Sequence, residues 1–243
     1  MEKRIQLLGI AVDIASTNDA RELTVHYIDE GSGKVAYLVN SETLLLLQEK
    51  SDWKELVEES QQVLPGNANV NASIDTVLGY QRIPFCFEDY FDAILDYAIE
   101  VGYELLLVAQ DEEKFNRIQE NIREKRPFLT LSGTYLLEEE TTFERVVNEI
   151  NSVAPDILLV ALEEKTQLEL LQQFKNQMNA GMMLFIGNIL YNKVVSEAEV
   201  PESIQKLKID NFYRWFQKDG AIKTFFTNLK VNLKLKKHNK DNQ

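Results

Sequence analysis

Short apolar runs alternate with stretches of helical spacing along most of this chain. Most of the runs are continuously apolar, which is typical of parallel strands buried on both faces of a sheet. The predicted strands are Gln6–Val12, Val35–Val39, Gln62–Leu64, Glu104–Ala109, Phe128–Ser132, Ile157–Ala161 and Met182–Ile186. Strands that alternate with helices over short connections predict an α/β fold, a parallel sheet with helices on both faces.

The helical stretches complete this pattern. Apolar residues at helical spacing predict helices over Ser41–Ser60, Glu88–Val101, Glu112–Lys125, Phe143–Val153 and Lys165–Ala180. Residues 203–236 also have helical spacing but no strand partners. We therefore divide the chain into an α/β domain, residues 1–200, and a basic amphipathic helical appendage and tail, residues 201–243.

Charge is distributed unevenly between these two parts. The net charge is −13, yet residues 201–243 hold 10 Lys and Arg against 4 Asp and Glu. The acidic remainder disfavours nucleic acid as a partner, because it would repel phosphates. In the tail, lysines such as Lys230 and Lys234 are interleaved with apolar residues such as Leu229 and Leu233. This pattern is that of a solvated terminus or of a surface that docks on anionic lipid, with RNA binding a distant third.

Cysteine use and hydropathy bear on the cellular compartment. Cys86 is the single cysteine, which rules out an internal disulfide and fits a reducing compartment. The N-terminus lacks an apolar stretch of signal-peptide length, and no run approaches the roughly 18 residues needed to cross a bilayer. We expect a cytoplasmic protein, with peripheral attachment to the inner face of the cell membrane if the tail binds lipid.

Recognisable catalytic and cofactor motifs are absent from the sequence. His26 and His238 are far apart and lack ligand partners in sequence, so we expect no metal, and no P-loop or Ser-His-Asp order suggests a cofactor or a triad. The turn after a predicted strand, Val63–Asn67, lies where an α/β enzyme presents its chemistry. At that turn Gly66 offers no acid, base or nucleophile.

Several short segments occur together in a recognisable order. They are Leu8–Asp13, Val39-Asn40-Ser41-Glu42, Val63-Leu64-Pro65-Gly66, Pro155–Leu162, Gln167 and Ile209–Trp215. In this order they resemble the motifs of the WecG/TagA/CpsF glycosyltransferases (glycosyltransferase family 26). The resemblance covers roughly Arg4 to Asp219.

The resemblance implies a Rossmann-like fold and a function in bacterial cell-surface polysaccharide synthesis of the teichoic acid or capsule type. Members transfer a sugar, often N-acetylmannosamine, from a UDP-sugar to an undecaprenyl-diphosphate-linked acceptor. It makes Asn40, Gln167 and Arg214 candidate substrate-binding residues, with the arginine meeting phosphates. From the residues alone, Asn40 could instead cap a helix, and Gln167 and Arg214 could lie in water.

The departures from the family pattern concentrate at polar and glycine positions. The proposed general-base aspartate of the family is replaced by Gly66, a threonine by Leu38, and a double glycine by Ala109-Gln110. A second family motif loses its glycine and its aspartate in the segment Arg82–Phe87. A third motif loses an aspartate and glycines in the segment Gly187–Val195, and a glutamate of the family is replaced by Leu168. The apolar skeleton that folding needs is kept, whereas residues that the chemistry needs are lost.

Three functions therefore compete. We favour a catalytically degenerate relative, with no catalytic residue, that pairs with an active glycosyltransferase or with itself. The alternative is an active enzyme that uses a UDP-sugar, Gln167, Arg214 and a substitute base such as Glu42 or Asp75. The third is a module that binds a nucleotide or sugar without reaction.

Overall fold

A computed structural model describes residues 3–31, 33–137, 142–197 and 221–241 of the chain. The strands are β1 (Arg4–Leu7), β2 (Ile10–Asp13), β3 (Lys34–Val39), β4 (Gln62–Pro65), β5 (Glu104–Ala109), β6 (Thr130–Leu136), β7 (Ile157–Ala161) and β8 (Met182–Phe185). The helices are α1 (Thr17–Glu30), α2 (Ser41–Leu47), α3 (Ser51–Glu58), α4 (Ala68–Leu78), α5 (Phe87–Val101), α6 (Glu112–Lys125), α7 (Phe143–Val153), α8 (Glu164–Phe174), α9 (Ile189–Glu197) and α12 (Ala221–Asp241).

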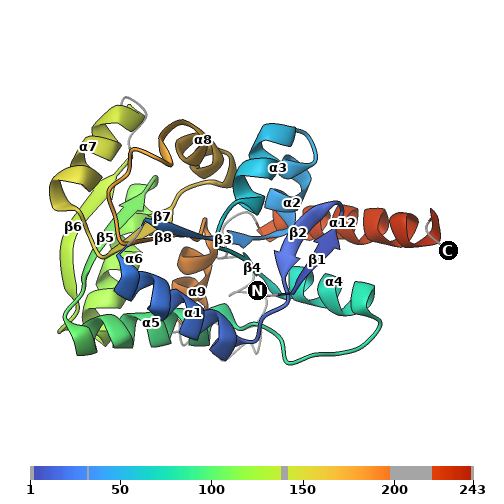
Figure 1. Ribbon diagram of the computed structural model, residues 1–243, viewed down its shortest axis with the longest axis horizontal. Helices are drawn as coiled ribbons and strands as arrows, with labels where there is room; N and C mark the ends of the chain where they lie inside the picture. The colour runs from blue at the N-terminus through green and yellow to red at the C-terminus, as the bar shows by residue number, and fades with distance from the viewer. Residues whose placement is uncertain (1–2, 32, 138–141, 198–220, 242–243) are drawn as a thin grey trace, which may run out of the picture.

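The strands β3 to β8 form one parallel sheet in the order β4-β3-β8-β7-β5-β6. Side chains along each strand alternate between the faces: Val35, Tyr37 and Val39 join one apolar cluster, and Ala36 and Leu38 join the other. Helices α2, α3, α7 and α8 cover the first face, and α1, α5, α6 and α9 cover the second (Figure 1). The expected α/β fold with a Rossmann-like parallel sheet is confirmed.

The prediction of one strand over Gln6–Val12 is wrong. This stretch is a β-hairpin in which β1 and β2 pair antiparallel, outside the parallel sheet. Its two-residue turn is formed by Leu8 and Gly9, with φ of 52° and 82°. Two positive φ values match the turn twist that tight hairpins require. The apolar run concealed the turn, because leucine rarely adopts this conformation.

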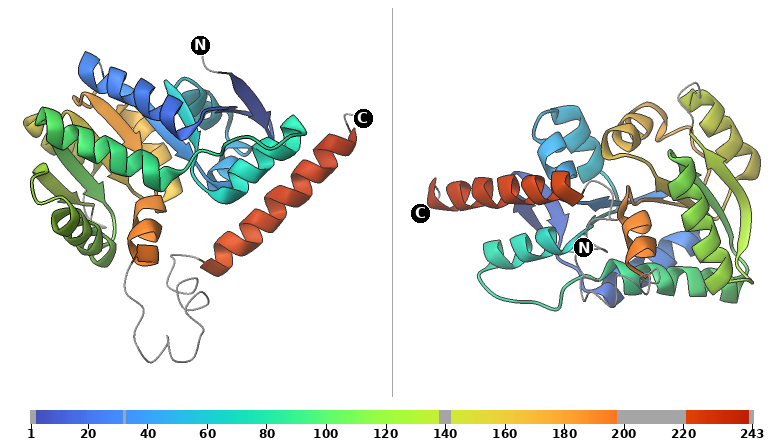
Figure 2. Two further views of the ribbon diagram at one scale, coloured as in Figure 1. Left: turned by 90° about the horizontal axis from the view of Figure 1, so that it is seen from below. Right: turned by 180° about the vertical axis from the view of Figure 1, so that it is seen from behind.

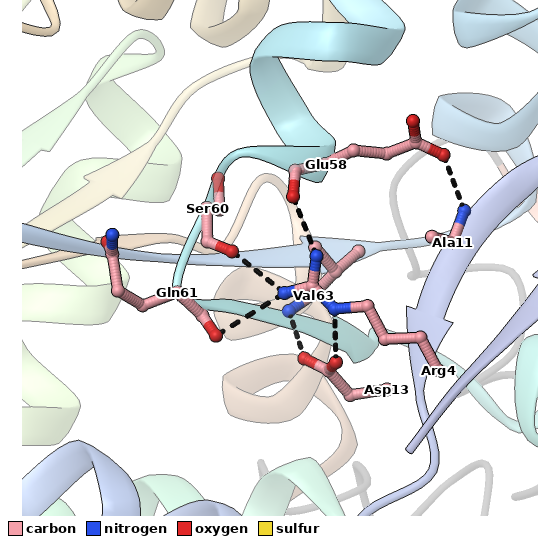
Figure 3. A network of polar contacts seen from close by, with 7 residues as sticks. All are labelled: Arg4, Ala11, Asp13, Glu58, Ser60, Gln61 and Val63. Atoms are coloured by element: carbon pink, nitrogen blue, oxygen red, sulfur yellow. Dashed lines mark hydrogen bonds and ion pairs between the residues drawn. The ribbon is translucent and has the colours of Figure 1, made fainter. Parts of the chain in front are cut away.

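A polar network fastens the hairpin to the sheet (Figure 3). The Asp13 carboxylate is 1% exposed; it accepts a hydrogen bond from the Val63 amide and lies 2.6 Å from Nε of Arg4. The Arg4 guanidinium also donates to the carbonyl oxygens of Glu58 and Ser60 at 2.6 and 2.8 Å. The hairpin is therefore held by hydrogen bonds to the backbone around the end of α3 and the start of β4, and by burial of Leu7, Ile10 and Val12, in place of strand pairing with the sheet.

Several helices differ from the sequence prediction. Ser41–Ser60 contains two helices, α2 and α3, separated by residues 48–50. Helices α1 and α4 were not predicted, although both carry start signals. Ser16 and Asp19 form a capping box before α1, and the Asn67 side chain accepts from the Val70 amide at the start of α4.

Helix α12 lies beside α2 and α4 at one end of the molecule (Figure 2). Its side chains Val231 and Leu235 are buried against the first apolar cluster. Nζ of Lys223 lies 2.6 Å from Oε1 of Glu42, and Nζ of Lys234 donates to Oε1 of Gln48. Part of the predicted appendage is thus a helix packed on the α/β body.

Arg214 and the remainder of the predicted appendage up to residue 220 lie outside the described residues. None of the helices in the described ranges has both the length and the apolar character that a membrane span requires.

Candidate functional site

The strand order brings distant residues together at the carboxyl edge of the sheet. Gly66 follows β4, Asn40 follows β3, Gly187 lies just beyond β8, and Glu164 begins α8 after β7. These four strands are neighbours in the order β4-β3-β8-β7. In open parallel sheets this edge is where ligands bind, so we take it as the candidate site.

A buried carboxylate lies at the centre of this edge. Glu164 is 3% exposed. Its Oε1 accepts from Nδ2 of Asn40 at 2.7 Å, and its Oε2 accepts from Oγ1 of Thr43 at 2.7 Å and from Nε2 of Gln167 at 2.9 Å. Glu164 was not among the predicted site residues, although Glu163 and Glu164 form an acidic pair one residue after the buried strand β7.

Burial determines the protonation of this group. Burial, with a smaller contribution from the charge of Glu42, raises the pKa of Glu164, whereas the hydrogen bonds from Thr43, Asn40 and Gln167 lower it; the net pKa is about 7. Burial, together with the charge of Glu164, also raises the pKa of Tyr37 well above its ordinary value. The carboxyl group therefore titrates near neutral pH while the tyrosine stays neutral.

Both amide candidates are engaged within the protein. Asn40 caps α2: its Oδ1 accepts from the amides of Glu42 and Thr43 at 2.8 and 3.0 Å. Gln167 is fully buried, with Nε2 donating to the Tyr37 hydroxyl at 2.8 Å and Oε1 accepting from the Gly187 amide at 3.1 Å. The structure thus brings Asn40 and Gln167 together through Glu164, and its full burial excludes the alternative in which Gln167 lies in water. Substrate binding by either residue stays a prediction.

The Glu164 carboxylate also occupies the space beside Gly187. Its φ is +54°, and a Cβ atom placed on it would contact Oε1 of Glu164 well inside van der Waals distance. Any side chain at this position would compete with the Glu164 carboxylate for the same space.

The space at Gly66 is occupied by a neighbour. A Cβ atom on Gly66 would lie 2.6 Å from Cδ1 of Ile189 and 3.1 Å from the carbonyl oxygen of Val39. The Gly66 amide donates to that same carbonyl at 2.7 Å, which fixes the turn against β3. A longer side chain cannot enter here unless Ile189 moves.

A pocket of about 480 Å³ opens beside Gly66. One wall is a face of α4 that includes Asn71 and Asp75, and the other is formed by Pro84–Glu88 and Ile189. Apolar walls with a few carboxylates and amides are typical of small-molecule sites. Among the residues that the structure describes, Asp75 and Glu88 line the pocket and no lysine or arginine does.

The two substitute bases are both held by cations. Nε of Arg82 lies 3.2 Å from Oδ1 of Asp75, and the Glu42 carboxylate pairs with Lys223 of α12. Only Asp75 lines the pocket beside Gly66; Glu42 does not. The structure therefore does not bring the two candidates to one place. Leu38 is fully buried.

No group of three or more His, Cys, Asp or Glu side chains in the described ranges is arranged to hold a metal ion. A cation does lie at the edge: Nζ of Lys114, at the start of α6, is 3.4 Å from Oδ1 of Asn188. Lys114 follows β5, whereas Glu164 follows β7 and Gly66 follows β4. In the strand order β4-β3-β8-β7-β5, Glu164 therefore lies between Gly66 and Lys114.

Comparison with known proteins decides the family. The model of the glycosyl transferase WecG/TagA/CpsF family matches residues 5–240, nearly the whole chain. The chain belongs to this family. The resemblance drawn from the sequence motifs is confirmed. No curated protein sequence matches the chain.

Two parts of the carboxyl edge, one at Gly66 and one at Glu164, can be compared with the family motifs. At the WecG/TagA/CpsF turn, where the sequence resemblance implies an aspartate, the structure has Gly66 packed against Ile189. At the family segments matched by Val39-Asn40-Ser41-Glu42 and by Gln167, both Asn40 and Gln167 are kept, and both bind Glu164. One side has lost its polar group, and on the other the polar groups are directed at an internal carboxylate.

Proposed function

We propose that the chain is a catalytically degenerate WecG/TagA/CpsF protein that supports bacterial cell-surface polysaccharide synthesis, of the teichoic acid or capsule type. Its role is that of a partner or scaffold for an active glycosyltransferase. The observation that carries this proposal is Gly66: it has no acid or base at the turn where the family's aspartate is expected, and a Cβ atom there would lie 2.6 Å from Cδ1 of Ile189. Loss of a general base typically removes a factor of about 10² to 10⁴ in rate.

The remaining polar groups support the same conclusion. Asn40 and Gln167 satisfy their hydrogen bonds inside the protein, and Asp75 is paired with Arg82. The amide hydrogens of Asn40 and Gln167 that bind Glu164 would have to leave it before they could bind a substrate. A scaffold has no need of free groups at this edge.

Calorimetric titration with UDP and UDP-sugars tests the proposal. We expect little or no heat of binding, and no UDP release when a polyprenyl-diphosphate acceptor is added. Co-purification with an active glycosyltransferase from the native cell would support the partner role. Acceptor-dependent UDP release by the isolated protein would contradict it, and UDP binding without release would favour a ligand-binding module.

The pocket beside Gly66 supports a second candidate, an active glycosyltransferase with a rebuilt site. Asp75 and Glu88 bring carboxylates to its lining, and Lys114 brings a cation to the same edge of the sheet. In that case Asp75→Asn would abolish UDP release while leaving UDP binding intact. If the wild-type protein releases no UDP, Asp75→Asn and wild type will not differ in UDP release.

We also propose that α12 attaches the protein to the anionic inner face of the cell membrane. The helix buries Val231 and Leu235 and leaves Phe226, Leu229 and Leu233 largely exposed. Lys230, Lys234 and Lys237 line the same outer face. Apolar side chains flanked by lysines are typical of helices that lie in the membrane interface, and each lysine contributes about 1 kcal/mol near an anionic surface.

Flotation with lipid vesicles tests this attachment. We expect binding to vesicles rich in phosphatidylglycerol, loss of binding in Leu229→Asp/Leu233→Asp, and little binding to phosphatidylcholine. Thr224→Asp, which adds a negative charge elsewhere on α12, is the matched control. Equal binding by both variants would contradict a role for the outer face.

A further inference from the structure

Three hydrogen-bond donors converge on one point inside the carboxyl edge of the sheet. They are Nδ2 of Asn40, Oγ1 of Thr43 and Nε2 of Gln167, and each lies within 2.9 Å of a Glu164 oxygen. The donors come from the end of β3, from α2 and from α8, so the folded body holds them in place.

Each amide donor is oriented by contacts that do not involve Glu164. Oδ1 of Asn40 accepts from two amides at the start of α2, and Oε1 of Gln167 accepts from the Gly187 amide. Turning either amide over would set a donor against a donor. The donor groups are therefore preorganised for an acceptor whether or not Glu164 is present.

Glu164 itself has no positively charged partner among the residues that the structure describes. Its carboxylate is compensated by the three donors alone. A buried carboxylate without a counter-ion is costly unless hydrogen bonds satisfy it. The arrangement is that of a small carboxyl ligand in a binding site, except that the ligand is tethered to the chain.

We infer that Glu164 is an internal ligand, whose carboxylate occupies a preformed site for a small monocarboxylate and closes it to ligands from solution. The site is formed by Asn40, Thr43 and Gln167. This inference goes beyond the proposed function, because it holds whether or not the protein transfers a sugar.

Glu164→Ala tests the inference by emptying the site. The atoms lost are Cγ, Cδ and two oxygens, which correspond to the heavy atoms of acetate. At pH 7.5 we expect acetate to raise the melting temperature of this variant saturably and to leave wild type unchanged. Acetamide has the same shape but turns an NH₂ group toward the donors, so it should give much less stabilisation. Sodium chloride controls for ionic strength.

A second substitution shows whether acetate binds at this place. Thr43→Val removes one donor with little change in volume. A hydrogen bond to a charged group contributes about 1.5–3 kcal/mol, so in the Glu164→Ala background acetate should bind at least about tenfold more weakly. Thr76→Val, which alters an exposed helix residue far along α4, should leave acetate affinity unchanged.

Folding of the variant does not decide the outcome. If Glu164→Ala is unfolded in chloride, acetate and not acetamide should restore its near-ultraviolet circular dichroism. The inference is overturned if acetate acts no better than acetamide or chloride, or if Thr43→Val leaves the acetate response intact. Because neither readout uses UDP or a sugar acceptor, failure here is separate from failure of the proposed function.

Discussion

At the scale of single residues, Gly66 is as much a packing residue as a missing base. The space that a side chain would take is filled by Ile189 and by the backbone of Val39. The substitution of glycine for an acid and the apolar residue beside it therefore form one arrangement. An acid at position 66 would clash with Ile189, and a smaller residue at position 189 would leave a void beside Gly66.

Gly66→Asp should destabilise the protein and leave it without transferase activity. The clash with Ile189 is an overpacking change, which costs about 1–3 kcal/mol in the free energy of unfolding. Adding Ile189→Ala should return part of that loss by making room. Urea denaturation and UDP release measure the two effects; a Gly66→Asp protein as stable as wild type would contradict the packing argument.

The buried Glu164 should make stability depend on pH. Its pKa is raised from 4.5 to about 7, so the folded protein binds this proton more tightly than the unfolded chain does. The contribution to stability is complete below pH 4.5 and is lost as pH rises through about 7. The full loss is about 3 kcal/mol, at 1.36 kcal/mol for each pKa unit.

Glu164→Gln removes this titration. The difference in the free energy of unfolding between pH 5 and pH 8, measured by urea denaturation, should be smaller in the variant than in wild type. Other titrating groups are common to both proteins and cancel in the comparison. Equal differences would show that Glu164 does not titrate in this range.

At the scale of elements, the β1–β2 hairpin shows how a segment can join a domain without joining its sheet. The Asp13 carboxylate binds the Val63 amide of β4 and Arg4 of its own hairpin. The Ala11 amide adds a bond to Oε1 of Glu58 at 2.8 Å. These contacts fix the hairpin across the end of α3 and the start of β4.

Asp13→Ala should cost about 1–3 kcal/mol, because the buried Val63 amide is left without its acceptor. Hydrogen exchange at the Val63 amide should also speed up, because that amide loses its acceptor. Glu120→Ala, an exposed change on α6, serves as the control and should lie within about 0.5 kcal/mol of wild type. Unchanged exchange at Val63 would argue against the anchor.

At the scale of the whole molecule, α12 belongs to the core of the body. Val231 and Leu235 are in the same apolar cluster as the strands and helices α2, α3, α7 and α8. The helix also pairs with Glu42 at the start of α2, close to Asn40. We therefore expect α12 and the α/β body to unfold together.

Val231→Ala/Leu235→Ala should lower the free energy of unfolding by roughly 3–5 kcal/mol, from the cost of cavities at buried aliphatic positions. The transition in urea should stay single, with a lower midpoint and an unchanged slope. Leu229→Ala/Leu233→Ala, on the outer face of the same helix, should change stability little. Two separate transitions would mean that α12 is an independent unit.

The sequence predicts best those elements whose signal is local, that is, contained within the element itself. Strands β3, β5 and β7 and helices α5, α6 and α7 match their predicted positions within one residue, because apolar periodicity is a local property. The Leu8-Gly9 turn was missed because it lies within an apolar run, and the break between α2 and α3 because helical spacing resumes beyond the polar residues 48–52. The start signals of α1 and α4 were present but were not used.

The sequence alone determined the fold class, the family and the amphipathic character of the C-terminal helix. Only the tertiary structure decided what happens at the carboxyl edge. Glu164 is 124 residues from Asn40 and 121 from Thr43, and Ile189 lies equally far along the chain from Gly66. Local pattern does not encode the strand order that joins them, because each strand is compatible with several neighbours and the packing of the complete sheet selects one.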